Sequence, residues 1–505
     1  MITDPLGTAP RLHRGSNQSP KVGIIHFGPG AFFRAFTAVY TAEAMAIAGG
    51  NWGVCAVSLR SATIRNKLEP QDYAYTSVTL APDETRQDVI EVISSILVAT
   101  EDPEAVLTAM AEPDVKIVSM TITEKGYCHN PSTGDLRMDH PDISHDLSNL
   151  NMPRSAIGYV VSALARRRLA GQRPFTILSC DNLPDNGTLT RRVVLSFAHA
   201  VSPDLAEWIE AEAKFPITMV DRITPATVDT DIASLSDRTG YLDLGCVIHE
   251  PFRQWVIQDD FVDGLHPDWG ATDAQFVTDV APFEKMKLRC LNGTHSALAY
   301  LGYLAGYETI SDTVADPGFS SFVEIIWGSE IVPTVPQPEG ENLTNYCADL
   351  KKRYQNPSIR HLTWQIAMDG SQKIPQRILG TIADCLNADR PFPSLALAIA
   401  GWMRFVGGTD EKGNPIKVSD PLADRLKSAS DAHSAPADKV LSLLSISDIF
   451  DAKLAQNPIF VATVTSAYER LCQNGAQATI NAMVGTDKVT SKPKTNTPLS
   501  NTSSI

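Results

Sequence analysis

The sequence lacks the features that mark metal-binding and membrane-spanning proteins. Only eight of its 505 residues are cysteines, and none follow the C-x-x-C spacing of a zinc or iron–sulfur site, so we expect reduced, mostly buried thiols and no bound metal. Arg404 or His295 interrupts the longest apolar runs, and residues 1–20 contain no apolar core of signal-peptide length. A cytoplasmic protein without a membrane partner is therefore expected.

Positive charge is also scarce. The 43 Lys and Arg residues are outnumbered by 58 Asp and Glu residues, which gives a net charge of −15, and no basic block occurs apart from three lysines near the C-terminus. Binding to DNA or RNA phosphates requires clustered Lys and Arg, so nucleic acid is not an expected partner. The remaining composition is typical of a globular protein long enough for roughly two to four domains.

Short apolar segments alternate with longer amphipathic ones up to about residue 280. This alternation predicts an α/β fold in which a parallel sheet is covered by helices on both faces. The expected strands are 21–27, 53–59, 115–121, 175–180 and 217–220, and the expected helices are 31–49, 102–112, 154–171 and 186–200. Strand-like runs then become rare, and a second, mainly α-helical domain is predicted from helical stretches at 281–305, 318–330, 390–406 and 458–476.

A glycine-containing turn follows the first predicted strand. In KVGIIHFGPGAFFRAF, Gly28 and Gly30 stand between that strand and a helix, where glycine permits a tight turn and lets backbone N–H groups approach a pyrophosphate. This arrangement predicts a Rossmann-like dinucleotide site. Phe33 occupies the third position of the G-x-G-x-x-G pattern, so an ordinary structural turn is the alternative.

The end of the second strand bears on which dinucleotide binds. An acidic residue there would accept the ribose hydroxyls of NAD, but Arg60, Ser61 and Arg65 stand there instead. The two arginines either accommodate the 2′-phosphate of NADP or are simply solvated. We expect NAD, and NADP is not excluded.

These features divide the chain into four expected parts. They are a flexible N-terminal arm over 1–20, a Rossmann-like dinucleotide-binding domain over 21–280, a helical substrate-binding domain over 281–485 and a disordered tail over 486–505.

One helix of the second domain carries three polar residues suited to catalysis. Lys287, Asn292 and His295 lie at i, i+5 and i+8, which on an α-helix corresponds to about 0°, 140° and 80°. A desolvated lysine can exchange a proton with an oxygen whose carbon gains or loses hydride, and an amide and an imidazole can hold that oxygen and its neighbours. The alternative is an exposed lysine and a histidine that only packs.

Polar clusters also follow three predicted strands. Asp181 and Asn182 follow 175–180, Asp221 and Arg222 follow 217–220, and Thr123, Glu124 and Lys125 follow 115–121. Ligands of an open parallel sheet bind at the carboxyl ends of its strands, so these clusters and the glycine turn are expected to form one site. Turn or capping roles are the alternative for each cluster alone.

Taken together, several strings resemble the mannitol dehydrogenase family, the polyol-specific long-chain dehydrogenases and reductases. The resemblance spans about residues 21–485 and is carried by GPGAFFRAF, TITEKGYC, SCDNLPDNG, MVDRITP, EPFRQWVIQDDF, PFEKMKLRCLNGTHSALAYLGYLAGYETI and QIAMDGSQKIPQR. It implies a metal-independent oxidoreductase with a nicotinamide cofactor in the N-terminal domain.

The resemblance also implies a role for individual residues. Lys287 would be the general acid/base, Asn182 and Asn292 would hold the reacting oxygen, and His295 would act beside them. The implied substrate-binding residues are Asp221, Arg222, Lys373 and Glu284, of which Glu284 would also connect the lysine to solvent. The implied cofactor-binding residues are Phe27, Gly28, Pro29, Gly30, Ala31, Phe32, Arg34, Glu124 and Lys125.

Two positions depart from the resemblance, one from the common family pattern and one from the relatives that oxidise mannitol. Phe36 replaces a histidine that commonly ends the F-x-R-A-H string, and Gln365 stands where those relatives tend to carry arginine. The string around Lys373 looks more like the uronate-reducing branch. A sugar-acid carboxylate needs cationic or N–H donors, and Lys373, Arg377 or Arg222 could supply them.

This resemblance implies interconversion of D-fructuronate and D-mannonate in hexuronate catabolism, by a monomer or weak homo-oligomer. A mannitol 2-dehydrogenase or another polyol or uronate oxidoreductase, such as one acting on tagaturonate, is the alternative within the family. A non-catalytic dinucleotide-binding sensor is the alternative from another class, but the sequence retains the polar residues that an active cleft requires.

Overall fold

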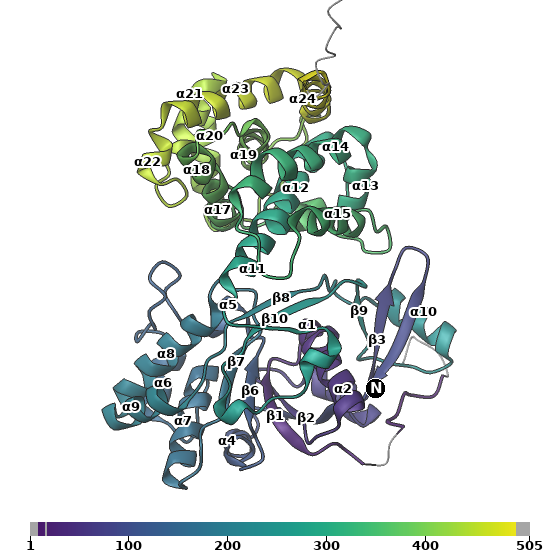
Figure 1. Cartoon of the computed structure of the whole chain (residues 1–505), viewed down its shortest axis with the longest axis vertical. Coiled ribbons are helices and arrows are strands. Elements are labelled where there is room, and N and C mark those ends of the chain that lie inside the picture. Colours follow the sequence, from purple (N-terminus) through teal and green to yellow (C-terminus); the bar gives the residue numbers. More distant parts are fainter. Residues whose placement is uncertain (1–8, 16–17, 491–505) are drawn as a thin grey trace, which may run out of the picture. The chain divides into compact units, whose positions relative to one another are not determined.

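The computed structural model describes residues 9–15 and 18–490. The chain forms two compact units that divide between Glu284 and Lys285, which we call the N-terminal and C-terminal units (Figure 1). Among the described residues, no helix combines the length and apolar character needed to cross a bilayer.

The N-terminal unit is built on a five-stranded, wholly parallel sheet with the order β5-β2-β1-β6-β7. Successive residues of a strand point to opposite faces of the sheet. Ile24 and Val54 belong to the buried cluster on one face, and Ile25 and Cys55 belong to the cluster on the other face. The prediction of a parallel sheet covered on both faces is therefore confirmed. Its strands are β1 (Val22–Phe27), β2 (Gly53–Ser58), β5 (Ile93–Val98), β6 (Ile117–Met120) and β7 (Thr176–Ser179).

The prediction included in this sheet one strand, 217–220, that belongs to another sheet. Strand β8 (Thr218–Asp221) pairs antiparallel with β10 (Gln254–Gln258) in a separate sheet of order β11-β10-β8. A side-chain hydrogen bond from Thr218 Oγ1 to the Ser179 carbonyl, at 2.6 Å, links β8 to β7. The sequence did not reveal β5 as a strand of the parallel sheet, because two serines interrupt the apolar residues of ISSILV.

Two small sheets, ten α-helices and three short 3-10 helices complete the described part of the N-terminal unit, before α11 (Ala281–Met286) at its end. The predicted helix over 31–49 is broken at Phe36, whose φ of −127° and ψ of −88° are not helical. The remaining strands are β3 (Tyr75–Leu80), β4 (Thr85–Ile90), β9 (Val247–His249) and β11 (Gln275–Val277). The helices of this unit are α1 (Ala31–Ala35), α2 (Thr37–Ala48), α3 (Thr63–Leu68), α4 (Pro103–Ala111), α5 (Thr123–Gly126), α6 (Pro141–Ser148), α7 (Ala156–Leu169), α8 (Asn186–Val201), α9 (Pro203–Glu212) and α10 (Asp229–Thr239).

The described part of the C-terminal unit is helical, as predicted, and contains three π-helical segments. These are η4 (Lys287–Gly293), η5 (Ile326–Ile331) and η7 (Pro375–Leu379). The helix α11 (Ala281–Met286) precedes η4 and contains the boundary between the units. The α-helices after the boundary are α12 (Thr294–Ala305), α13 (Ile310–Ala315), α14 (Pro317–Ile325), α15 (Leu343–Tyr354), α16 (Thr363–Ile366), α17 (Gly370–Ile374), α18 (Gly380–Asn387), α19 (Pro393–Val406), α20 (Ala423–Asp431), α21 (Pro436–Leu444), α22 (Ala452–Ala455), α23 (Pro458–Asn474) and α24 (Ala476–Thr490).

The described residues near the two ends of the chain differ from the flexible arm over 1–20 and the disordered tail over 486–505 that the sequence predicts. Leu12 is buried, and its N–H donates to the carbonyl of Leu242 at 2.9 Å. Arg14 Nη2 donates to the Asp72 carbonyl at 3.0 Å. Residues 9–15 are thus attached to the N-terminal unit, and α24 continues beyond residue 485. Residues 1–8, 16–17 and 491–505 lie outside the described part, as does the prediction that concerns them.

Candidate active site

The turn after β1 places different demands on its two glycines. Gly28 has a φ of +92°, and a Cβ there would lie 2.2 Å from the carbonyl oxygen of Thr121. Gly30 has an ordinary φ of −70°, and a Cβ there would meet nothing closer than 3.9 Å. Gly28 is therefore required by the fold, whereas the space in front of Gly30 is open to a ligand such as a dinucleotide pyrophosphate.

A buried histidine, which the sequence analysis missed, supports this turn. His26 Nε2 lies 3.0 Å from Thr121 Oγ1 and 3.3 Å from the Gly28 carbonyl, and Nδ1 lies 2.8 Å from Ser119 Oγ. Its ring stacks on Phe33 at 3.7 Å, so the side chain at the third glycine position fills the space between helix and strand. Burial lowers the pKa of His26 to about 3, which keeps the ring neutral. The sequence could have identified His26, because a histidine within an otherwise apolar predicted strand is unusual.

Arg34 and Phe36 are buried near the start of the first two helices, where both contact other parts of the protein. Arg34 is buried and donates to the carbonyls of Pro29 and Gly245, so it fixes the turn. Phe36 is fully buried and packs 5.1 Å from the ring of Tyr40 and 5.8 Å from that of Trp255. The position of the family histidine is therefore apolar in this chain.

Asp181 organises the carboxyl ends of β6 and β7. Its carboxylate accepts N–H bonds from Ile122 and Thr123 at 2.9 and 2.8 Å, and Tyr127 Oη donates to it at 2.8 Å. These bonds hold Thr123 at a φ of +62°. Glu124 and Lys125 on α5 and Asn182 after β7 are exposed at these strand ends. The structure thus brings the glycine turn, Glu124, Lys125 and Asn182 together at the carboxyl ends of the parallel strands.

The predicted residues after β8 belong to the antiparallel sheet instead. Asp221 is buried and pairs with Gln254 in the β8–β10 ladder. Arg222 is half-buried and donates from Nη1 to the carbonyl of Ala35 at 2.6 Å, which links the end of β8 to the junction of α1 and α2. Burial, with nearby Arg253, lowers the pKa of Arg222 to about 10. Glu284 Oε1 accepts the N–H of Asp185 at 3.0 Å, beside the segment that carries Asn182.

The two arginines after β2 differ in availability. The Arg60 side chain is 86% exposed and lies 3.8 Å from the carboxylate of Asp142. Arg65 is paired with Glu101 and also donates to Asn66. Arg65 is thus committed to neighbours, and Arg60 alone remains near the strand end with a largely solvated guanidinium.

In the C-terminal unit, the candidate catalytic residues do not lie on a regular α-helix. Lys287 begins η4, Asn292 lies near its end, and His295 lies in the first turn of α12. The predicted angle of about 140° between Lys287 and Asn292 is therefore wrong. Hydrogen bonds of the i→i+5 type bring residues five apart to nearly the same side of the helix, so this geometry aligns Lys287 and Asn292 better than the prediction did.

Side chains and a close backbone contact stabilise η4. A Cβ on Gly293 would lie 2.7 Å from the carbonyl oxygen of Arg377 in η7, so only glycine allows this approach. The Cys290 carbonyl accepts bonds from Thr294 Oγ1 at 2.6 Å and Trp327 Nε1 at 2.8 Å. The Leu291 carbonyl accepts one from Tyr354 Oη at 2.9 Å. Lys287 is 7% exposed in this setting.

His295 lies within a group of cationic side chains. Its ring is 4.4 Å from that of His361, and its Nε2 has no hydrogen-bond partner among the described residues. Burial, followed by electrostatic interaction with His361, Arg377, Arg353 and Lys373, lowers the pKa of His295 well below its usual value. Burial likewise lowers the pKa of Lys373 to about 8. The sequence analysis missed His361 because it stands alone in a short, unpatterned segment.

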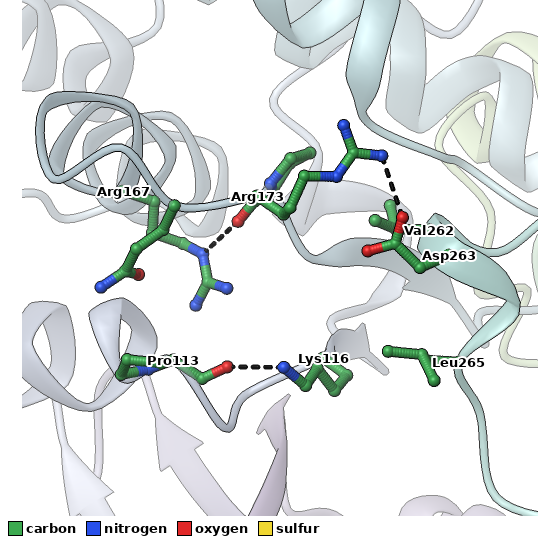
Figure 2. A pocket seen from close by; sticks show the side chains of 9 residues that line it. Pro113, Lys116, Arg167, Arg173, Val262, Asp263 and Leu265 are labelled. Carbon is green, nitrogen blue, oxygen red and sulfur yellow. Dashed lines mark hydrogen bonds and ion pairs between the residues drawn. The ribbon is translucent and has the colours of Figure 1, made fainter.

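One hollow of the N-terminal unit is lined by none of the candidate site residues. It measures about 240 Å³ and lies at the amino ends of β6 and β7, where Lys116 and Pro174 form part of its wall (Figure 2). Arg167 uses its guanidinium to cap the end of α4 through the Glu112 carbonyl at 2.8 Å, and Arg173 pairs with Asp263 at 3.1 Å. The cationic side chains that line this hollow thus bond to acceptors within the protein. The hollow lies at the amino ends of the strands, whereas the glycine turn lies at the carboxyl end of β1. No group of three or more His, Cys, Asp or Glu residues suited to a metal occurs in the described part of the chain.

Comparison with known proteins identifies the family. Residues 22–270 match the mannitol dehydrogenase Rossmann domain, and residues 279–472 match the mannitol dehydrogenase C-terminal domain. The chain belongs to the mannitol dehydrogenase family and is an NAD(P)-dependent polyol or uronate oxidoreductase that acts on CH–OH groups.

Individual relatives differ in their substrates. The chain is 46% identical over 464 residues to D-mannonate oxidoreductase of Escherichia coli (strain K12), covering 91% of this chain and 95% of the relative. It is 39% identical over 479 residues to mannitol 2-dehydrogenase of Aspergillus terreus, covering 93% and 94%. Its fold is similar to Pseudomonas fluorescens mannitol 2-dehydrogenase in a ternary complex with NAD and D-mannitol, with a TM-score of 0.82, 36% identity and coverage of 95% and 98%.

Proposed function

We propose that this enzyme interconverts D-fructuronate and D-mannonate with NAD(H). The observation that carries the proposal is the cationic group around His295, to which Lys373, Arg377 and Arg353 contribute. A hexuronate carries a carboxylate that this group would stabilise, whereas a polyol does not. The 46% identity to D-mannonate oxidoreductase supports the same substrate.

The residues of the glycine turn fit a dinucleotide. The open space before Gly30 and the exposed Glu124 and Lys125 at the same sheet edge are suited to its pyrophosphate and adjacent groups. When bound, the nicotinamide supplies or accepts the hydride. We propose that Arg34 acts on this site indirectly, by fixing the turn through Pro29. We propose NAD as the preferred cofactor because Arg65 is already paired with Glu101.

The protein's own residues would handle the proton and the oxygen. We propose that Lys287 donates a proton to the ketone oxygen during reduction and removes it during oxidation. Asn292 donates a hydrogen bond to that oxygen as it gains negative charge, and neutral His295 orients a neighbouring hydroxyl. For Asn182, Asp221 and Glu284 we propose the roles that the family resemblance implies.

A substrate panel tests the proposal. Steady-state rates should be measured for fructuronate, tagaturonate and fructose, each with NADH and with NADPH. We expect the highest kcat/KM for fructuronate with NADH. A higher kcat/KM for fructose would instead favour a mannitol 2-dehydrogenase, the activity named for the 39% identical relative. The cytoplasmic location and the monomeric or weakly oligomeric state stay predictions.

A further inference from the structure

Arg377 is fixed beside the candidate catalytic helix. It lies in η7, and its Nη1 donates to Ser296 Oγ at 3.1 Å. Ser296 is fully buried and directly follows His295 on α12. The carbonyl of Arg377 lies close against Gly293, so both the backbone and the side chain of this arginine are held against the segment that carries Asn292 and His295.

The charge of Arg377 has no acidic partner in the described part of the chain. No carboxylate there lies within 4.0 Å of it, and no described acceptor takes a hydrogen bond from its Nε or Nη2. The groups that favour its charge are the phenols of Tyr300 and Tyr354, and burial raises the pKa of Tyr300, which keeps that phenol neutral. Arg289, which lies in the same unit, pairs with Asp384 at 2.6 Å. Arg377 is thus a partly buried cation that lacks the partner Arg289 has.

Lys373, the other cation near His295, is less suited to binding a carboxylate. Its ammonium donates to the carbonyls of Met368 at 2.5 Å and Ile366 at 3.3 Å. The carboxylates of Asp369 and Asp420 also favour its charge. Two of its three donors therefore serve the protein itself, whereas the Nε and Nη2 edge of Arg377 can hold both oxygens of one carboxylate.

We propose that Arg377 is the residue that recognises the carboxylate of the sugar acid and so selects hexuronates over uncharged ketohexoses. This inference rests on the proposed function. The guanidinium would bind the carboxylate through two parallel N–H···O bonds from Nε and Nη2, while Ser296 keeps Nη1 in place. An uncharged sugar would leave the guanidinium without its partner, which weakens binding.

The test compares Arg377→Gln and Arg377→Lys with Arg360→Gln. Arg360 is an exposed arginine of the same unit that pairs with Glu308, and it serves as the matched control. Values of kcat and KM are measured for fructuronate, tagaturonate and fructose with NADH. For Arg377→Gln we expect kcat/KM to fall about 100-fold with the hexuronates and far less with fructose, mainly through KM. Arg377→Lys should recover only part of the loss, and Arg360→Gln should match the wild type.

A rescue measurement separates recognition from structural support. Adding millimolar guanidinium ion to Arg377→Gln should raise its rate with hexuronates and leave its rate with fructose unaltered. An equal loss with charged and uncharged substrates would overturn the assignment of Arg377 while leaving the proposed function intact. If the wild type reduces tagaturonate instead of fructuronate and Arg377→Gln loses that activity selectively, the assignment holds and the proposed substrate fails. A wild type without activity on either hexuronate would overturn both.

Discussion

At the scale of single residues, Gly28 and Gly30 allow the structural and ligand-binding demands of one turn to be separated. Gly28→Ala would place a Cβ 2.2 Å from a backbone oxygen at a φ of +92°, so we expect a loss of about 3 kcal/mol or more in the free energy of unfolding. Gly30→Ala meets no such contact and should change that free energy by less than about 0.5 kcal/mol. Denaturant titration of both variants measures these effects.

Gly30→Ala should instead weaken cofactor binding. Its added methyl group would enter the open space before the turn, and overpacking of this kind costs about 1–3 kcal/mol, or roughly a 5-fold to 150-fold rise in the Kd for NADH. Fluorescence titration with NADH measures the Kd. An unaltered Kd would show that the pyrophosphate does not approach Gly30.

Lys287 gives a second prediction at this scale. Lys287→Ala should lower kcat by about 10²- to 10⁴-fold, because the proposed proton transfer occurs in the transition state, while the Kd for NADH stays nearly constant. Lys285→Ala is the matched control, since Lys285 lies two residues earlier and pairs with Asp384 at 3.4 Å. Nearly normal turnover by Lys287→Ala would remove this lysine from the mechanism.

At the scale of elements, the π-helical segments define the shape of the catalytic helix. Gly293→Ala in η4 would force a Cβ to within 2.7 Å of the Arg377 carbonyl, so η4 and η7 must separate. We expect a stability loss of about 1–3 kcal/mol and a fall in kcat/KM, because Asn292 and Arg377 both shift. Gly328→Ala in η5 has nothing within 4 Å and serves as the control. Thermal unfolding and steady-state kinetics measure the two effects.

The same elements show how far sequence periodicity predicts structure. The apolar runs at 21–27 and 53–59 predicted β1 and β2 because strands buried on both faces are continuously apolar. Periodicity did not reveal η4, since a π-helical segment depends on the contact of Gly293 with η7, which lies far along the chain. It also assigned 217–220 to the wrong sheet, because an apolar run does not specify its pairing partner.

The residues of the candidate site likewise divide into those that the sequence predicted and those that it missed. Motif residues such as Gly28, Lys287 and Lys373 were predicted because their neighbours in sequence carry the pattern. His26 and His361 were missed because their roles depend on residues distant in sequence, such as Ser119 for His26 and His295 for His361. Resemblance thus identified residues of the motifs, and only the fold identified the residues that support them.

At the scale of the whole molecule, the net charge of −15 coexists with a local excess of positive charge. His295 lies within the influence of Lys373, Arg377 and Arg353. Local charges at a site, rather than the net charge, govern the binding of an anionic substrate once it enters, while net charge affects its approach. The acidic surface is therefore compatible with a sugar-acid substrate.

Buried neutral histidines predict how stability depends on pH. Burial lowers the pKa of His26 and His249 to about 3 and that of His361 to about 4. The unfolded chain takes up protons near pH 6.5 while the native rings stay neutral, so stability is retained above pH 6.5 and falls as the pH decreases toward these lower values. Each histidine should cost about 2 kcal/mol by pH 5. The measurement is the melting temperature between pH 7.5 and pH 5.

Replacing single histidines identifies which unit carries this sensitivity. His26→Gln should make melting of the N-terminal unit less dependent on pH, and His361→Gln should do the same for the C-terminal unit, even though each variant is less stable at pH 7.5. The exposed His433→Gln is the control and should leave the dependence unaltered. If wild type and His26→Gln lose the same number of degrees between pH 7.5 and pH 5, protonation of His26 on unfolding does not contribute to acid lability.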